Sequence, residues 1–193
     1  ECCIAYFSHN SQYKIVGIVA DDEYHIGTDF LGVKAYKFSE INAQIEKESV
    51  SFVPCIGYRN LNRTREEIFS KLIGIGCKIG NLVSLDLDDD YLDIGLGNII
   101  FPNSLVQPYS KIGNGNIIWP GAMVGHHSTI NNFNWLTSNC SLGGNVKMGS
   151  RVFVGLNASI SNGIRIGDEN IIGVDVTVTK STENGVVKIK NET

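Results

Sequence analysis

Aliphatic residues recur at every sixth position along the second half of the chain. Counting in steps of six from residue 94 to residue 178, all fifteen positions carry Ile, Val, Leu or Met. These residue types make up 54 of the 193 residues, so such a run has a chance on the order of 10⁻⁸ in a given frame. The positions are Ile94, Ile100, Val106, Ile112, Ile118, Val124, Ile130, Leu136, Leu142, Met148, Val154, Ile160, Ile166, Ile172 and Val178.

A period of six fits neither an α-helix nor an ordinary strand, but it fits a short flat strand followed by a tight turn. Glycine follows many of the aliphatic positions, and small residues or Asn often stand four places after them. Gly and Asn suit turns because they tolerate positive φ. The pattern predicts an all-β parallel β-helix whose coils bury the aliphatic row against one another. The alternative is a buried strand-rich domain with accidental periodicity.

The first part of the chain, residues 1–75, follows a different pattern. Strand and helix signals alternate there, which predicts a small α/β domain with a parallel sheet. Pro54 favours an edge or a strand end for the second strand. The expected order is a strand at 13–20, a helix at 38–45, a strand at 51–57 and a helix at 62–73.

The repeat weakens toward its start, because Leu82 fits the six-residue frame and Asp88 does not. A charge in the buried row would be costly, so we expect Asp88 to face outward. The acidic stretch 86–90 is expected to form a solvated turn rather than a metal site. The expected organisation is an α/β domain at 1–75, a β-helix at 76–180 and a C-terminal tail at 181–193.

Composition narrows the class of protein. Hydrophobic residues make up 42% and charged residues 19%, which suits a packed core. The formal charge of −4 and the lack of a basic cluster argue against a nucleic-acid surface. No apolar run approaches the roughly 18 residues of a membrane span. The five cysteines contain no C-x-x-C pair, which favours a reducing, cytoplasmic setting.

Two of the four histidines, His126 and His127, lie inside the repeat, where short side chains prevail. The other two, His9 and His25, stand in polar surroundings and are expected at the surface. Because successive strand residues point to opposite faces, we expect the rings of His126 and His127 to point apart. One imidazole alone would then serve a site, where it can accept a proton near neutral pH.

The hexad pattern resembles the hexapeptide-repeat, left-handed β-helix acyltransferases, in which three hexads form one triangular coil. The layout of residues 1–75 resembles the partial Rossmann-like first domain of one branch of that family. This branch contains sialic acid O-acetyltransferases and nucleotide-aminosugar N-acetyltransferases of bacterial glycan synthesis. The resemblance covers nearly the whole chain. It implies a homotrimer that transfers an acetyl group from acetyl-CoA to a sugar or nucleotide-sugar, by O- or N-acetylation and without a metal.

The resemblance assigns chemical roles to three residues. The segment 124–130 reads Val-Gly-His-His-Ser-Thr-Ile, in which His126 matches the family's catalytic base. Gly144, three hexads further on, matches the residue whose backbone N–H stabilises the oxyanion. His127 occupies the place of an acid that orients the base. Either another carboxylate or a backbone carbonyl therefore orients His126, or the base is weaker.

The resemblance also implies a cofactor site. In the family, acetyl-CoA lies in the groove between two neighbouring β-helices. The positions that contact it match Trp135, Ser138, Leu156 and Val174. Trp135 either stacks on the sugar or pantetheine, or packs at a subunit contact.

A sugar-nucleotide site is implied in the first domain, where Asp21, Asp22 and Gly57 match an acidic pair and a glycine of the family. Their alternative role is that of polar loop residues at strand ends. The family's first strand and glycine-rich turn would precede Glu1, and we expect residues upstream of it.

Two other functions stay open on the sequence. A metal-dependent hydratase like the γ-class carbonic anhydrases shares this fold but needs several histidine ligands around zinc. A non-catalytic β-helix scaffold that binds a partner is the second alternative.

Overall fold

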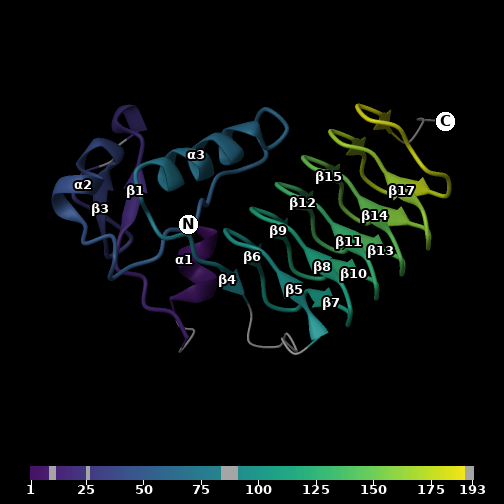
Figure 1. The fold of residues 1–193 in the computed structure, drawn as a ribbon, viewed down its shortest axis with the longest axis horizontal. Helices are drawn as coiled ribbons and strands as arrows, with labels where there is room; N and C mark the ends of the chain where they lie inside the picture. Colours follow the sequence, from purple (N-terminus) through teal and green to yellow (C-terminus); the bar gives the residue numbers. More distant parts are fainter. Residues whose placement is uncertain (9–11, 25–26, 84–90, 190–193) are drawn as a thin grey trace.

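The computed structural model describes residues 1–8, 12–24, 27–83 and 91–189. Figure 1 shows an elongated molecule, with short helices and a small sheet at one end and a ladder of coils running to the C-terminus. The predictions made for His9, His25, Asp88 and the acidic stretch 86–90 fall outside the described residues.

The repeat forms a parallel β-helix built from very short strands. The strands pair in parallel to form three sheets, with the orders β19-β16-β13-β10-β7, β17-β14-β11-β8-β5 and β20-β18-β15-β12-β9-β6-β4. Val124 pairs with Leu142, the third axial position after it, so three hexads make one coil as predicted. This pattern fits a left-handed β-helix. The strands are β4 (Leu82–Val83), β5 (Asp93–Ile94), β6 (Ile99–Ile100), β7 (Leu105–Val106), β8 (Lys111–Ile112), β9 (Ile117–Ile118), β10 (Met123–Val124), β11 (Thr129–Ile130), β12 (Trp135–Leu136), β13 (Ser141–Leu142), β14 (Lys147–Met148), β15 (Phe153–Val154), β16 (Ser159–Ile160), β17 (Arg165–Ile166), β18 (Ile171–Ile172), β19 (Thr177–Val178) and β20 (Val187–Lys188).

The aliphatic row fills the axis of the coils. Its members from Ile100 to Val178 are buried in one cluster, and Ile94 packs against that cluster. Inside one corner, Asn98, Asn116 and Asn134 are also fully buried. Asn98 Oδ1 accepts the backbone N–H of Asn116 at 2.8 Å, and Asn116 Oδ1 accepts that of Asn134 at 2.9 Å. Each amide therefore satisfies a backbone donor that the turn leaves unpaired.

Both ends of the β-helix depart from the six-residue frame. Val83 pairs with Ile100, which is less than three hexads away, so Val83 continues the axial row where the frame had predicted Leu82. Val187 pairs with Ile171, a separation that is shorter still. The predicted tail from residue 181 therefore contains a further partial coil. Its connection is shorter, so the six-residue spacing does not predict it.

The first part of the chain contains a three-stranded sheet of order β1-β3-β2. β3 runs parallel to β1 and antiparallel to β2, so the sheet is mixed rather than parallel. The predicted strand at 13–20 is confirmed only at its end, and the predicted helices near 38–45 and 62–73 are both present. The elements are α1 (Cys2–Phe7), β1 (Ile18–Ala20), η1 (Asp22–Tyr24), β2 (Asp29–Phe30), β3 (Val33–Lys37), η2 (Phe38–Glu40), α2 (Ile41–Gln44) and α3 (Arg63–Gly74).

The predicted strand at 51–57 does not form. Its Phe52 makes a single parallel bridge with Ile79, through an N–H donated to Lys78 O at 2.8 Å and a carbonyl that accepts Gly80 N–H at 3.0 Å. A longer strand needs a neighbour with a row of donors and acceptors, and Pro54 has no N–H to offer. A Rossmann-like sheet is therefore not confirmed.

Helix α3 joins the first part of the chain to the coils. Phe69 packs edge-on against Phe133, with ring centroids 5.4 Å apart. The fully buried Arg65 donates from Nε to Gly115 O at 2.8 Å, from Nη2 to Asn134 O at 3.2 Å and from Nη1 to Ile56 O at 3.1 Å. Burial lowers the pKa of Arg65 to about 10, so the guanidinium stays protonated at neutral pH.

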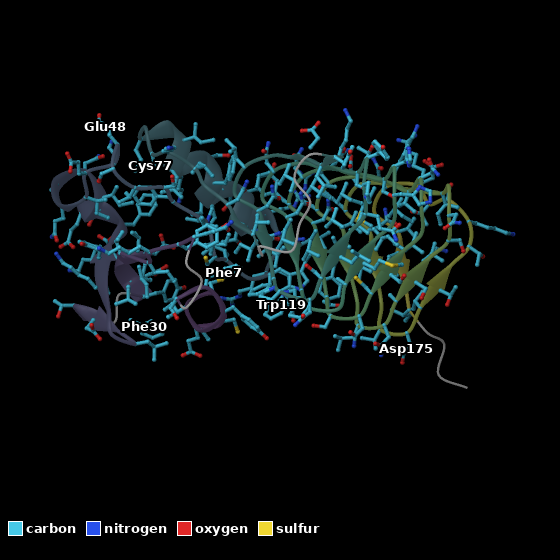
Figure 2. The ribbon with its side chains drawn as sticks, turned by 90° about the horizontal axis from the view of Figure 1, so that it is seen from below. Phe7, Phe30, Glu48, Cys77, Trp119 and Asp175 are labelled. Carbon is cyan, nitrogen blue, oxygen red and sulfur yellow. The ribbon has the colours of Figure 1, made fainter. Side chains whose placement is uncertain are left out.

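An aromatic cluster seals the junction between α1 and the first coils, where Figure 2 places Phe7 and Trp119. Phe101 lies between these two residues, with its ring centroid 5.7 Å from Phe7 and 4.6 Å from Trp119.

The five cysteines are free thiols. Within the described residues, no helix has the length and apolar character needed to cross a membrane.

Candidate active site

The two histidines of the repeat lie in the turn between β10 and β11, and both side chains are exposed. The preceding residue must be small, because a Cβ on Gly125 would stand 2.5 Å from the Gly143 carbonyl carbon of the next coil. The backbone N–H of His126 donates to Gln107 Oε1 at 2.9 Å. The turn is therefore fixed from both neighbouring coils, and the His126 ring projects from a defined backbone.

The rings of His126 and His127 contact each other, so the prediction that they point apart is wrong. Their Nδ1 atoms are 3.0 Å apart, and the ring planes are nearly perpendicular at 89°. Strand alternation does not apply here, because His127 sits in a turn with a φ of 60°, in the left-handed region. One Nδ1 must donate and the other accept, so the pair shares one proton in this contact.

His127 therefore contacts Nδ1 of His126, where the sequence analysis had expected a carboxylate or a backbone carbonyl to orient the ring. For Nε2 of His126 to act as a base, its Nδ1 must carry the proton and donate it to Nδ1 of His127. This contact fixes the tautomer and the direction of the His126 ring without supplying a negative charge.

Gly144 lies directly under the His126 ring. A Cβ placed on Gly144 would stand 2.7 Å from both Cε1 and Nε2 of that ring, so only glycine leaves room for it. The backbone N–H of Gly144, to which we assigned the oxyanion, donates to Asn162 Oδ1 at 3.0 Å. Sequence reasoning missed Asn162, although it stands one coil after Gly144 and is exposed beside the same corner.

The predicted cofactor residues lie at a different corner of the triangle. Ser138, Leu156 and Val174 follow β12, β15 and β18 and stack along one edge, where Leu156 and Val174 are 47% and 52% exposed. His126 stands at the edge that follows β10. The sheet β19-β16-β13-β10-β7 separates the two edges, so one chain does not bring them together.

Trp135 is 9% exposed and belongs to the junction with the first part of the chain. Tyr58 packs edge-on against it at 5.3 Å, and the Arg65 guanidinium lies 5.6 Å from its ring centroid. Packing thus accounts for Trp135, within the chain itself, and we leave it out of the candidate groove.

The predicted sugar-nucleotide residues stand on separate elements. Asp21 follows β1, and Asp22 begins η1, where its Oδ1 accepts the Ser39 N–H at 3.1 Å. Gly57 is exposed in the loop before α3, which is not part of the three-stranded sheet. Two parallel strands would have placed these residues at the same edge of a sheet. Because the strand at 51–57 does not form, the sheet does not bring Gly57 to Asp21 and Asp22.

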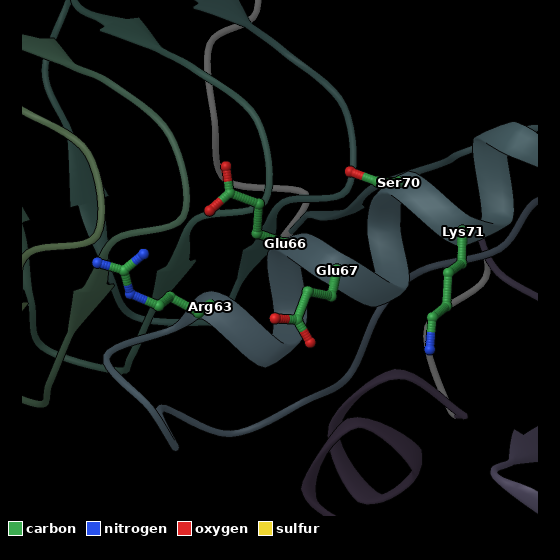
Figure 3. Close-up of a pocket in the computed structure, with 5 residues that line it drawn as sticks. All are labelled: Arg63, Glu66, Glu67, Ser70 and Lys71. Atoms are coloured by element: carbon green, nitrogen blue, oxygen red, sulfur yellow. The ribbon is translucent and has the colours of Figure 1, made fainter.

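An open pocket runs along α3 (Figure 3). Arg63, Glu66, Glu67, Ser70 and Lys71 line it. Arg63 pairs with Glu169 at 2.6 Å, which ties this face of the helix to the coils. Among the described residues there is no group of three or more His, Cys, Asp or Glu side chains that could hold a metal ion.

No protein-family model matches the sequence, and no significantly similar curated protein was found. Solved structures do share the fold. The acetyltransferase domain of PglB from Neisseria gonorrhoeae FA1090 matches with a TM-score of 0.84 and 18% identity, over 96% of this chain and 88% of that one. The same domain in complex with acetyl coenzyme A gives a TM-score of 0.77 and 20% identity, over 86% and 80% of the two chains.

A further match is a variant of perosamine N-acetyltransferase from Caulobacter crescentus, in complex with CoA and GDP-perosamine. Its TM-score is 0.75 and its identity 23%, over 86% of this chain and 81% of that one. These likenesses support the predicted left-handed β-helix, while the predicted Rossmann-like first domain is not confirmed.

Proposed function

We propose that this protein transfers an acetyl group from acetyl-CoA to a hydroxyl or amino group of a sugar or nucleotide-sugar, in bacterial surface glycan synthesis. The observation that carries the proposal is the exposed His126 ring, with Nδ1 held by His127 and the Nε2 side resting on Gly144. The fold supports the class of reaction, because the solved structures that share it include an acetyltransferase domain and a perosamine N-acetyltransferase.

In the proposed reaction, Nε2 of His126 removes the proton of the acceptor N–H or O–H as the acceptor attacks the thioester carbonyl. A C–N or C–O bond forms, and the carbonyl oxygen becomes an oxyanion. When the intermediate collapses, the C–S bond breaks and the CoA thiolate takes the proton back from His126. No covalent enzyme intermediate is required.

Two chains would complete one site in this proposal. His126 and the edge of Ser138, Leu156 and Val174 flank one sheet from opposite sides, so a groove with both needs a second copy. We therefore propose a homotrimer that binds acetyl-CoA between neighbouring β-helices. Free cysteines suit a reducing cytoplasmic setting.

In the first part of the chain, we keep Asp21, Asp22 and Gly57 as a proposal for sugar-nucleotide contacts. We also propose that residues 1–75 and 76–180 form two domains.

Two substitutions of Asn162 test whether the Gly144 N–H or the Asn162 amide donates to the oxyanion. If Gly144 N–H is the donor, Asn162→Ala frees it and should leave kcat within a few-fold of wild type. Asn162→Asp keeps the acceptor but places a negative charge beside the oxyanion, and it should lower kcat. Steady-state kinetics of both variants decide the point. A loss of about 10²–10³ in kcat for Asn162→Ala would instead make the Asn162 amide the donor.

The function itself is tested by incubating the protein with acetyl-CoA and a panel of UDP- and GDP-linked sugars, including GDP-perosamine, with a mass-spectrometric readout. A gain of one acetyl group on an acceptor supports the proposal. No transfer, together with no acetyl-CoA binding by calorimetry, would favour a scaffold. Stoichiometric zinc in the purified protein would favour the hydratase.

A further inference from the structure

A column of exposed aromatic rings leads along one corner to the candidate base. Tyr91, Tyr109 and His127 occupy the same place in successive coils, three hexads apart. The ring centroids of Tyr91 and Tyr109 are 5.5 Å apart, and those of Tyr109 and His127 are 4.9 Å apart. Tyr91 is 51% exposed and Tyr109 58% exposed. His127 is the last ring of this aromatic column and contacts His126.

Two of these residues have a strained backbone. Tyr109 has a φ of 63° and His127 a φ of 60°, in the left-handed region that bulky residues rarely occupy. At the corner of Ser138, Leu156 and Val174, the left-handed residues are types that tolerate this conformation. They are Asn103, Gly121, Asn139, Asn157 and Asp175.

Bulky left-handed residues also occur at the corner that faces α3, but there the packing explains them. Phe133 packs against Phe69. Arg151 pairs with Glu66 at 3.1 Å and with Glu169 at 2.9 Å. Tyr109 packs against its column neighbours and remains mostly exposed, so the core does not account for its strain. Strain at a residue that also contacts a candidate site is typical of a functional role, and the Tyr109 ring contacts His127.

We propose that the aromatic column of Tyr91, Tyr109 and His127 is the acceptor subsite and binds the pyranose ring of the acceptor sugar. This inference rests on the proposed function and deepens it. The C–H face of a pyranose is weakly positive and packs on the negative face of an aromatic ring, while phenolic hydroxyls bond to sugar hydroxyls. A sugar on the column lies beside His127, and therefore next to the ring that would take its proton.

The test uses Tyr109→Asn, which removes the ring and suits the left-handed backbone. Leu31→Asn is the matched control, because Leu31 is also exposed, at 62%, and left-handed, with a φ of 52°, but lies between β2 and β3. Both variants should keep or raise the melting temperature. Only Tyr109→Asn should raise KM for GDP-perosamine, by roughly tenfold or more, the scale of one lost stacking contact, with KM for acetyl-CoA unchanged.

A second measurement does not depend on turnover. Saturation transfer from irradiated aromatic protons to the ring protons of methyl perosaminide is expected with wild-type protein and with Leu31→Asn, and it should be lost in Tyr109→Asn. No transfer with wild-type protein, or equal transfer with Tyr109→Asn, would overturn the subsite. This holds even if GDP-perosamine is not acetylated, an outcome that counts against the proposed function for this acceptor.

Two further outcomes would overturn the inference. A melting temperature of Tyr109→Asn below that of wild type would mean that the ring contributes to stability. If Tyr109→Asn made the oligomer dissociate in sedimentation experiments, the aromatic column would be a subunit contact.

Discussion

Replacing His126 with Ala is expected to lower kcat for acetyl transfer by about 10²–10⁴, the usual contribution of a general base. The ring is exposed at a turn and contributes nothing to the axial core, and its backbone N–H keeps the bond to Gln107. Melting temperature and circular dichroism should therefore match wild type. The measurement is steady-state kinetics at saturating acetyl-CoA, with an acceptor found in the mass-spectrometric screen.

A second variant displaces the His126 ring without removing it. In Gly144→Ala, the new Cβ would stand 2.7 Å from Nε2, so the ring must move away from its place on the turn. We expect a lower kcat in this variant as well. Lys71→Ala, on the exposed face of α3, is the control and should be fully active. Full activity in both His126→Ala and Gly144→Ala would exclude His126 as the base.

The sequence predicted the coil interior well because local geometry enforces it. Each coil has one axial position per hexad, and a polar residue there would be buried without a partner. The row from Ile100 to Val178 is therefore buried throughout. The frame failed at Val83, which pairs with the axial Ile100, and at Lys188, which pairs with the axial Ile172, because coils shorter than three hexads close the ends. Coil length at an end depends on what packs there, and a fixed period carries no such information.

The candidate site was predicted in part. His126 and Gly144 follow from the motif and the three-hexad spacing, and the same spacing would have led to Asn162. The direction of the His127 ring depends on a left-handed turn that strand alternation does not describe. The burial of Trp135 depends on Arg65, which is distant in sequence and reaches it only through tertiary packing.

Replacing Arg65 with Ala is expected to destabilise the fold by roughly 3–5 kcal/mol. The substitution removes the donor of the Ile56 and Gly115 carbonyls and opens a cavity beside Trp135. The Asn134 carbonyl loses one of its two donors and keeps the backbone N–H of Ile117 at 3.0 Å. Buried acceptors that lose their donor cost about 1–3 kcal/mol each when water cannot replace it. The measurement is the free energy of unfolding from urea denaturation, compared between variant and wild type.

Arg63 gives a matched control on the same helix. Its ion pair with Glu169 has side chains that are 47% and 30% exposed, so Arg63→Ala should cost at most about 1 kcal/mol. A cost for Arg65→Ala as small as that for Arg63→Ala would show that the buried guanidinium does not hold α3 to the coils.

The pH dependence of the Arg65 effect provides a further check. Burial lowers the folded-state pKa of Arg65 to about 10, from 12.5. Above about pH 10 the unfolded chain keeps the Arg65 proton that the folded chain has lost. The free energy of unfolding therefore rises with pH only in that range. The difference in unfolding free energy between wild type and Arg65→Ala should be flat from about pH 6 to 9. A slope in that range would mean that another titrating group contributes to the junction between α3 and the coils.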